Sequence, residues 1–174
     1  DRSDRHFLNH WLVGYVHATN TALQLSTGKW VARIDDHAIW TPTHISDLLG
    51  TAMEGGYEFV TSSVIEERYG ESTTSRGNYA FSEWTKVPKT QRRGIGNPRL
   101  GGHSTFFYRT YLKLFKYNVN AWRKNWNRTG ETDLFIRMLN TGVRIGFLDK
   151  VTVEHFPRPG EKTLFFDAYM AKVR

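Results

Sequence analysis

Two carboxylates and an imidazole stand side by side directly after a short apolar segment. Residues Trp30–Ile34 predict a buried strand, and the polar groups that follow it are Asp35, Asp36 and His37. Carboxylates at the end of an apolar strand need a cation or hydrogen-bond donors, and ligands of α/β folds bind at the carboxyl ends of strands. Position and chemistry together predict a divalent cation that holds an anionic substrate.

The competing interpretation is structural. In it, Asp35 and Asp36 only cap the turn that leads into the next element. The adjacent His37 favours the metal interpretation, since imidazole is a good ligand for transition metals.

A second apolar segment also ends in polar side chains. Residues Val143–Val153 predict a strand, which Glu154 and His155 follow. Because both polar groups end apolar strands, we expect Asp35 and His155 to lie close together at one edge of a sheet. Arg158 stands between two prolines, which favours extended backbone, and it could contact a phosphate.

Two further acids open a predicted helix. The helix begins at Gly130 and contains Glu131 and Asp133 in its first turn, and Gly142 follows its end. Acids in the first turn stabilise a helix through its dipole, so the simplest role for both is structural.

The elements that must position these groups alternate between helix and strand, which predicts an α/β fold with a mixed sheet. They are a helix over Tyr15–Leu25, a strand over Lys29–Asp35, a helix from Pro42 to Met53 with Thr41 as its cap, strands over Tyr57–Glu67 and Ser104–Arg109, a helical turn or two over Tyr111–Tyr117, a break in the strand 143–153 at Asp149 and Lys150, and a terminal helix after Gly160.

Residues 70–102 change character and predict a flexible loop, because glycine, proline and serine recur through them. A short strand near Tyr79–Trp84 is the one element expected there. The basic run Lys86–Arg93 has two interpretations, a solvated loop or a lid that closes over a bound anion. Trp84, Trp122 and Trp126 could stack on a sugar, although large aromatic side chains are more often part of a core.

Composition sets the limits of the fold and of the partners. The chain has 174 residues, 39% of them hydrophobic, and no cysteine, which predicts a single domain, 1–174, without disulfides or thiolate zinc sites. No apolar run is long enough to span a membrane and no leader is visible, so we expect a cytoplasmic protein. The net charge of +7 suits nucleic acid, an anionic membrane surface or a phosphorylated substrate.

The order of these motifs resembles the family 2 glycosyltransferases, which have the GT-A fold. The resemblance runs from about Gly14 to Gly160 and rests on five stretches in the family's order. They are Asn20 with Ala22 and Gly28, the acidic group Asp35-Asp36-His37, the run Gly101-Gly102-His103-Ser104 followed by Phe107-Tyr108-Arg109, the helix start from Gly130 to Arg137, and the strand from Gly142 to Leu148 with His155.

The resemblance implies an enzyme of this family, with a GT-A-like (Rossmann-like) mixed sheet flanked by helices. It implies an inverting transfer from a nucleotide-diphosphate sugar to a glycan or another hydroxyl acceptor, with Mn²⁺ or Mg²⁺ as cofactor. The roles it implies are metal ligation by Asp35, His37 and His155 (for His155 alternatively a phosphate contact or a structural role), substrate binding by Asp36, Asn20, Gly101, Gly102 and Arg158, and base catalysis by Glu131, with Asp133 as the second candidate.

The sequence departs from the family's pattern in three ways. His37 replaces the usual second carboxylate, and Glu131 stands where the family has an aspartate. The family's opening strands are missing, so we expect an N-terminally truncated GT-A domain. The alternative is a non-catalytic module on a degenerate transferase scaffold that binds polysaccharide or nucleic acid, of which nucleic acid is the less favoured partner.

Overall fold

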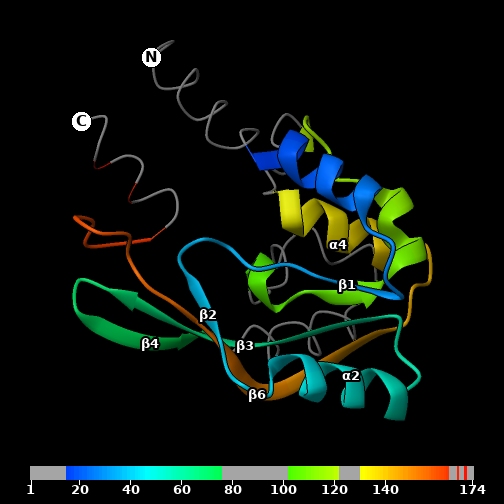
Figure 1. Cartoon of the computed structure of the whole chain (residues 1–174), viewed down its shortest axis with the longest axis horizontal. Coiled ribbons are helices and arrows are strands. Elements are labelled where there is room, and N and C mark those ends of the chain that lie inside the picture. Colours follow the sequence, from blue (N-terminus) through cyan, green and yellow to red (C-terminus); the bar gives the residue numbers. More distant parts are fainter. Residues whose placement is uncertain (1–14, 76–101, 122–129, 165–167, 169–170, 172–174) are drawn as a thin grey trace, which may run out of the picture. The chain divides into compact units, whose positions relative to one another are not determined.

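The computed structural model describes residues 15–75, 102–121, 130–164, 168 and 171. They form one mixed sheet with helices (Figure 1). The strands are β1 (Trp30–Ala32), β2 (Ala38–Trp40), β3 (Phe59–Arg68), β4 (Glu71–Ser75), β5 (Phe107–Arg109) and β6 (Ile145–His155). The helices are a helical segment at 15–25, α2 (His44–Glu54), α4 (Gly130–Asn140) and the 3₁₀ helices η2 (His103–Thr105) and η3 (Thr110–Phe115).

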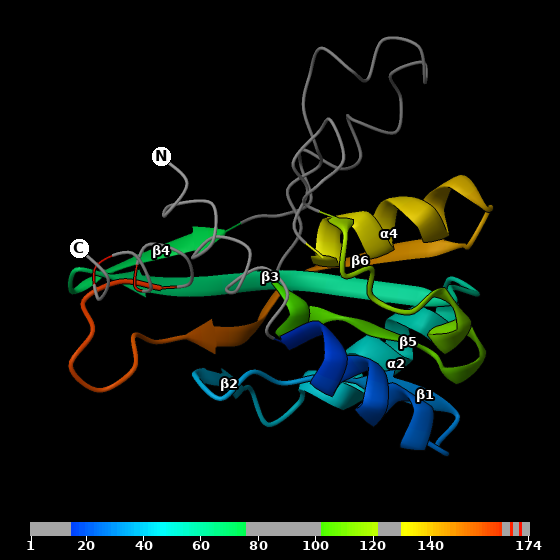
Figure 2. The same ribbon diagram turned by 90° about the horizontal axis from the view of Figure 1, so that it is seen from above.

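The sheet has the strand order β1–β5–β3–β6–β2, and β4 pairs with the far end of β3. The pair β3–β6 is parallel, whereas β2–β6, β3–β4 and β3–β5 are antiparallel. Figure 2 shows β6 running beside β3, with β4 folded back on β3. The predicted mixed α/β sheet is therefore confirmed.

The chain divides into two compact units, with boundaries that pass through β1 and β5. One contains residues 32–108 and 144–174. Its core forms around β3, because Phe59 is fully buried between the rings of Phe106 and Tyr108, at centroid distances of 4.9 and 5.6 Å. Helix α2 buries Leu48 and Ala52, one turn apart, against β3 and β6.

The other unit contains residues 1–31 and 109–143. The helical segment 15–25 is tied to the chain after η3 by Asn20, whose side-chain amide donates to the Tyr117 carbonyl and accepts from the Tyr117 N–H, at 2.9 and 2.8 Å. Helix α4 is tied to the same stretch by Arg137, which donates to the carbonyls of Phe115 and Lys116. The bonds from Arg137 satisfy carbonyls that the end of the short helix η3 leaves open.

Most predicted elements are present, and several differ in detail. Helix α2 begins two residues later than expected and its N-cap is Thr43, so the prediction of Thr41 as the cap was wrong. The expected break at Asp149 and Lys150 is a bulge, because the register with β3 passes from Leu148 to Val151.

Two strands were missed. The start of the predicted loop 70–102 forms β4, where a hairpin turns at Gly70 with a φ of +81°. The three residues of β2 are too few to show a periodicity. The expected strand near Tyr79–Trp84, the basic run Lys86–Arg93, Trp122, Trp126 and most of the expected terminal helix lie outside the described residues.

Candidate functional site

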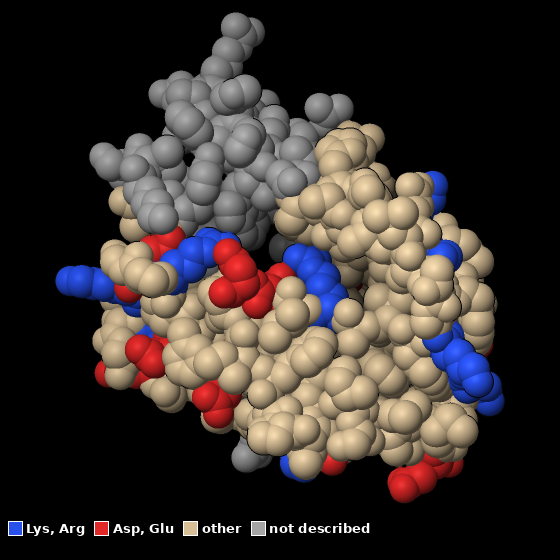
Figure 3. Space-filling model, viewed as in Figure 1, with Lys and Arg blue, Asp and Glu red and all other residues tan. Residues whose placement is uncertain are grey.

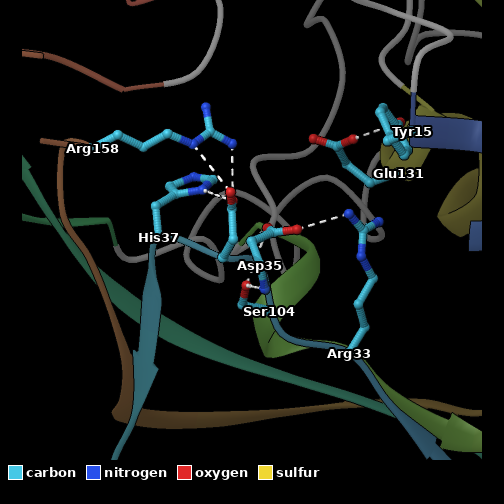
Figure 4. A network of polar contacts seen from close by, with 8 residues as sticks. Tyr15, Arg33, Asp35, His37, Ser104, Glu131 and Arg158 are labelled. Atoms are coloured by element: carbon cyan, nitrogen blue, oxygen red, sulfur yellow. Dashed lines mark hydrogen bonds and ion pairs between the residues drawn. The ribbon is translucent and has the colours of Figure 1, made fainter. Parts of the chain in front are cut away.

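Asp35 follows β1 and its carboxylate is held by two neighbours (Figure 4). Arg33 Nη2 donates to Asp35 Oδ1 at 2.7 Å, and Ser104 Oγ donates to Oδ2 at 3.1 Å. The Asp35 N–H also lies 3.0 Å from Ser104 Oγ. Burial opposes ionisation of Asp35, but the positive charge of Arg33 and the bond from Ser104 outweigh it and hold the pKa below its usual value.

The carboxylate of Asp36 faces Arg158. Arg158 Nη2 and Nε donate to the two Asp36 oxygens at 2.9 and 3.2 Å, and His37 Nδ1 donates to Oδ1 at 2.9 Å. The bonds from Arg158 and His37 lower the pKa of Asp36. The Asp36 side chain is 71% exposed, so this ion pair is open to solvent.

Two histidines meet beside this pair because β2 and β6 are paired. Ala38 stands opposite His155 in the register, and the rings of His37 and His155 are 5.5 Å apart. His155 is fully buried, and burial together with the neighbouring His37 lowers its pKa to about 4, so it is neutral at pH 7. Asp35 lies close enough to act on that pKa in the opposite direction, as expected from the sequence.

The structure places three further residues beside Asp35 to which the sequence analysis gave no role: Arg33, His103 and Ser104. Burial and the charge of Arg33 lower the pKa of His103 to about 3. Gly102 lies against His155, where a Cβ would come within 3.1 Å of Cε1. The neighbouring Gly101 lies outside the described residues. The sequence had marked His103 and Ser104 only as part of the motif that begins with these two glycines, and Arg33 carried no signal of its own.

The three expected ligands of the cation are not gathered around one point in this arrangement. Among the residues that the structure describes, no three His, Asp or Glu side chains are placed to hold a metal ion together. The carboxylate of Asp35 is turned to Arg33 and that of Asp36 to Arg158. The fold thus brings Asp35, His37 and His155 into one neighbourhood without forming a metal site from them.

The acids of α4 lie in the other unit, and they differ sharply from each other. Asp133 is fully buried and accepts from Arg137 Nε at 2.8 Å, one helical turn away. Glu131 is partly exposed and its Oε2 lies 3.4 Å from the hydroxyl of Tyr15 (Figure 4). The geometry favours a structural role for Asp133 and leaves Glu131 as the better candidate for chemistry.

The side-chain amide of Asn20 is bound within the protein. Both of its polar atoms bond the backbone of Tyr117, so its position explains a structural role, and substrate binding by Asn20 stays a prediction.

Residues 5–135 match the family model of glycosyl transferase family 2. The match spans well over half of the chain, and the chain therefore belongs to this family. It includes both the acidic segment 35–37 that follows β1 and the start of α4. No curated protein matches the sequence significantly.

Solved structures of S. aureus TarS share the fold. TarS residues 1–349 in complex with UDP superpose with a TM-score of 0.57 at 15% identity, over 85% of this chain and 41% of that one. TarS 1–349 in a second structure gives 0.53 at 14% identity, over 82% and 40%. The chain thus spans about two fifths of the TarS fragment that it matches. In the described part of the chain, no helix has the length and apolar character needed to cross a membrane.

Proposed function

We propose that the protein transfers a sugar, with inversion, from a nucleotide-diphosphate sugar to a hydroxyl acceptor. The observation that carries the proposal is the family match over residues 5–135, which contains both the strand end at Asp35 and the helix start at Glu131. The UDP bound to TarS makes a uridine diphosphate sugar the first donor to test.

In this proposal Glu131 is the base. Its carboxylate takes the proton of the acceptor hydroxyl, whose oxygen bonds the anomeric carbon as the bond to the diphosphate oxygen breaks. The partial exposure of Glu131 and its place in the first turn of α4 support this role. Departure of the diphosphate leaves concentrated negative charge, and Arg158 is the exposed cation proposed to receive it.

A requirement for Mn²⁺ or Mg²⁺ remains a separate prediction, which rests on the resemblance to the family. If Asp35, His37 and His155 are the ligands, binding of the ion requires Asp35 to break its ion pair with Arg33 and to bind the ion instead. No step of the transfer above depends on it.

The deciding variant is Glu131→Gln, which keeps the size of the side chain but cannot accept a proton. We expect turnover of a uridine diphosphate sugar to fall by about 10²–10⁴-fold and UDP affinity to stay unchanged in calorimetry. Retention of turnover by Glu131→Gln would remove Glu131 from the mechanism.

The companion variant is Asp133→Asn. It breaks a buried pair with Arg137 and should lower the free energy of unfolding by about 1–3 kcal/mol, while turnover of the folded protein falls far less than in Glu131→Gln. Urea unfolding measures the free energy of unfolding.

Asp47→Asn is the matched control, because Asp47 is also a first-turn acid, in α2, and pairs with the half-exposed Lys150. It should cost much less stability than Asp133→Asn, because Asp47 and its partner are screened by solvent. If Asp133→Asn abolished turnover at unchanged stability, the roles of the two acids would have to be exchanged.

A further inference from the structure

Gly130 and Tyr15 approach each other so closely that they constrain each other's identity. A Cβ built on Gly130 would lie 2.2 Å from the Tyr15 hydroxyl and 3.2 Å from its Cζ. A methyl group at Gly130 therefore cannot coexist with this position of the hydroxyl. The glycine lets the first turn of α4 begin directly against the phenol.

The ring of Tyr15 is fixed by its own contacts. It meets the ring of Tyr117 edge to face, with centroids 6.1 Å apart and planes at 80°. The backbone of Tyr117 is in turn bound from both sides by Asn20, one turn and a half along the helical segment of Tyr15. Tyr117 is therefore fixed against the helical segment by Asn20, and its ring in turn holds the ring of Tyr15 and its hydroxyl in place.

The hydroxyl is directed at the next residue of α4. Figure 4 shows Tyr15 and Glu131 facing each other, with Oε2 at 3.4 Å from the phenol oxygen. A phenol donates a hydrogen bond that stabilises the ionised carboxylate. The other charged groups on this part of α4, Asp133 and Arg137, bond each other.

We propose that Tyr15 is a positioning residue for Glu131: its hydroxyl orients the carboxylate and favours the ionised form. Gly130 leaves room for the Tyr15 hydroxyl because it has no Cβ. This inference rests on the proposed function, in which Glu131 accepts the acceptor's proton. Tyr15 acts through Glu131 and transfers no proton itself.

The test is Tyr15→Phe, which removes the hydroxyl and keeps the ring that packs on Tyr117. We expect kcat to fall about tenfold, the value for one hydrogen bond to a charged group, at an unchanged KM for the donor. The acid limb of the pH–rate profile should move to higher pH, because the carboxylate loses a donor that favours its ionised form. Tyr69→Phe, at a tyrosine that is 72% exposed, is the matched control and should change none of these.

Two double variants separate positioning from simple packing. In the Glu131→Gln background, Tyr15→Phe should have no further effect on turnover, because the group that it orients is gone. Gly130→Ala should reproduce the shift of the acid limb in the wild-type background and be milder beside Tyr15→Phe, where the atom at 2.2 Å is absent.

An unmoved pH profile together with a wild-type kcat in Tyr15→Phe would overturn the inference, as would a lower melting temperature with no change in the profile. If Glu131→Gln itself leaves turnover intact, the proposed base fails and the inference fails with it. If Glu131→Gln abolishes turnover and Tyr15→Phe does not alter it, only the inference fails.

Discussion

Arg158 binds Asp36 across 122 residues of sequence, and half of the Arg158 side chain and most of the Asp36 side chain remain open to water. Exposed ion pairs contribute little to stability, and a guanidinium with two donors in one plane matches a phosphate as well as a carboxylate. The pair is therefore better explained by what Arg158 can bind than by what it stabilises.

The variant Arg158→Gln tests this at the scale of the residue. The free energy of unfolding should change by less than about 1 kcal/mol, and UDP affinity in calorimetry should fall at least about tenfold, because a charge-assisted hydrogen bond is lost.

Arg144→Gln is the control for Arg158→Gln, because Arg144 forms a comparable exposed pair with Glu58. It should leave UDP affinity unchanged. Equal affinities in the two variants would exclude Arg158 from the diphosphate site.

At the scale of elements, α2 and β6 are joined through a buried polar contact. His44, the first residue of α2, bonds Thr152 of β6 at 2.8 Å and stacks on Trp40 of β2 at 4.4 Å. Thr152 also bonds Ser62 of β3 at 2.6 Å. The Nε2 atom of His44 is buried without a hydrogen-bond partner among the described residues, so a proton there would be costly.

This contact predicts a loss of stability in acid. Burial lowers the pKa of His44 from 6.5 to about 4, so between these pH values the unfolded chain binds a proton that the folded chain does not. The contribution of His44 to stability is therefore complete above pH 6.5 and is lost progressively as the pH falls toward 4. Urea unfolding between pH 4 and 7 measures it.

Replacement of the imidazole isolates the effect. His44→Gln should be less stable than the wild type at pH 7 and should lose less stability on acidification, whereas His17→Gln, at an exposed position, should follow the wild-type curve. Parallel curves for His44→Gln and the wild type would show that His44 does not carry the pH dependence.

At the scale of the whole molecule, the family match and the fold leave the role of a cation to be tested. UDP binding should be tighter in Mn²⁺ than in EDTA if Asp35, His37 and His155 accept an ion after Arg33 releases Asp35. Asp35→Ala and His37→Ala should remove that difference. Asp149→Ala, at an exposed residue of the β6 bulge, should keep it.

Equal UDP affinity in Mn²⁺ and EDTA would remove the cation from the proposal.

Titration with an oligonucleotide addresses the alternative of a nucleic-acid-binding module, which should bind the oligonucleotide without metal and lose affinity steeply with salt. On the face drawn in Figure 3, basic and acidic side chains are interspersed, which does not favour that alternative despite the net charge of +7.

The sequence by itself determined the α/β class, the strands around Trp30 and Phe59, and the helix from Gly130 to the glycine at 142. These features depend on local periodicity, on acids in the first turn of a helix and on a glycine, Gly142, where φ is +86°. All three are properties of residues that are close in sequence, so the sequence shows them. It also marked the acidic residues after the first strand by their type and position, and the resemblance to the family marked Glu131.

Only the tertiary structure decided which side chains meet. The pairing of β2 with β6 places His155 beside His37, Ser104 reaches Asp35, and Tyr15 reaches Glu131 across 116 residues. These contacts depend on strand register and on the closure of long loops. Local sequence patterns predict neither of them. For the same reason the carboxylates that suggested a cation in the sequence are found bound to arginines in the fold, one of them 122 residues away.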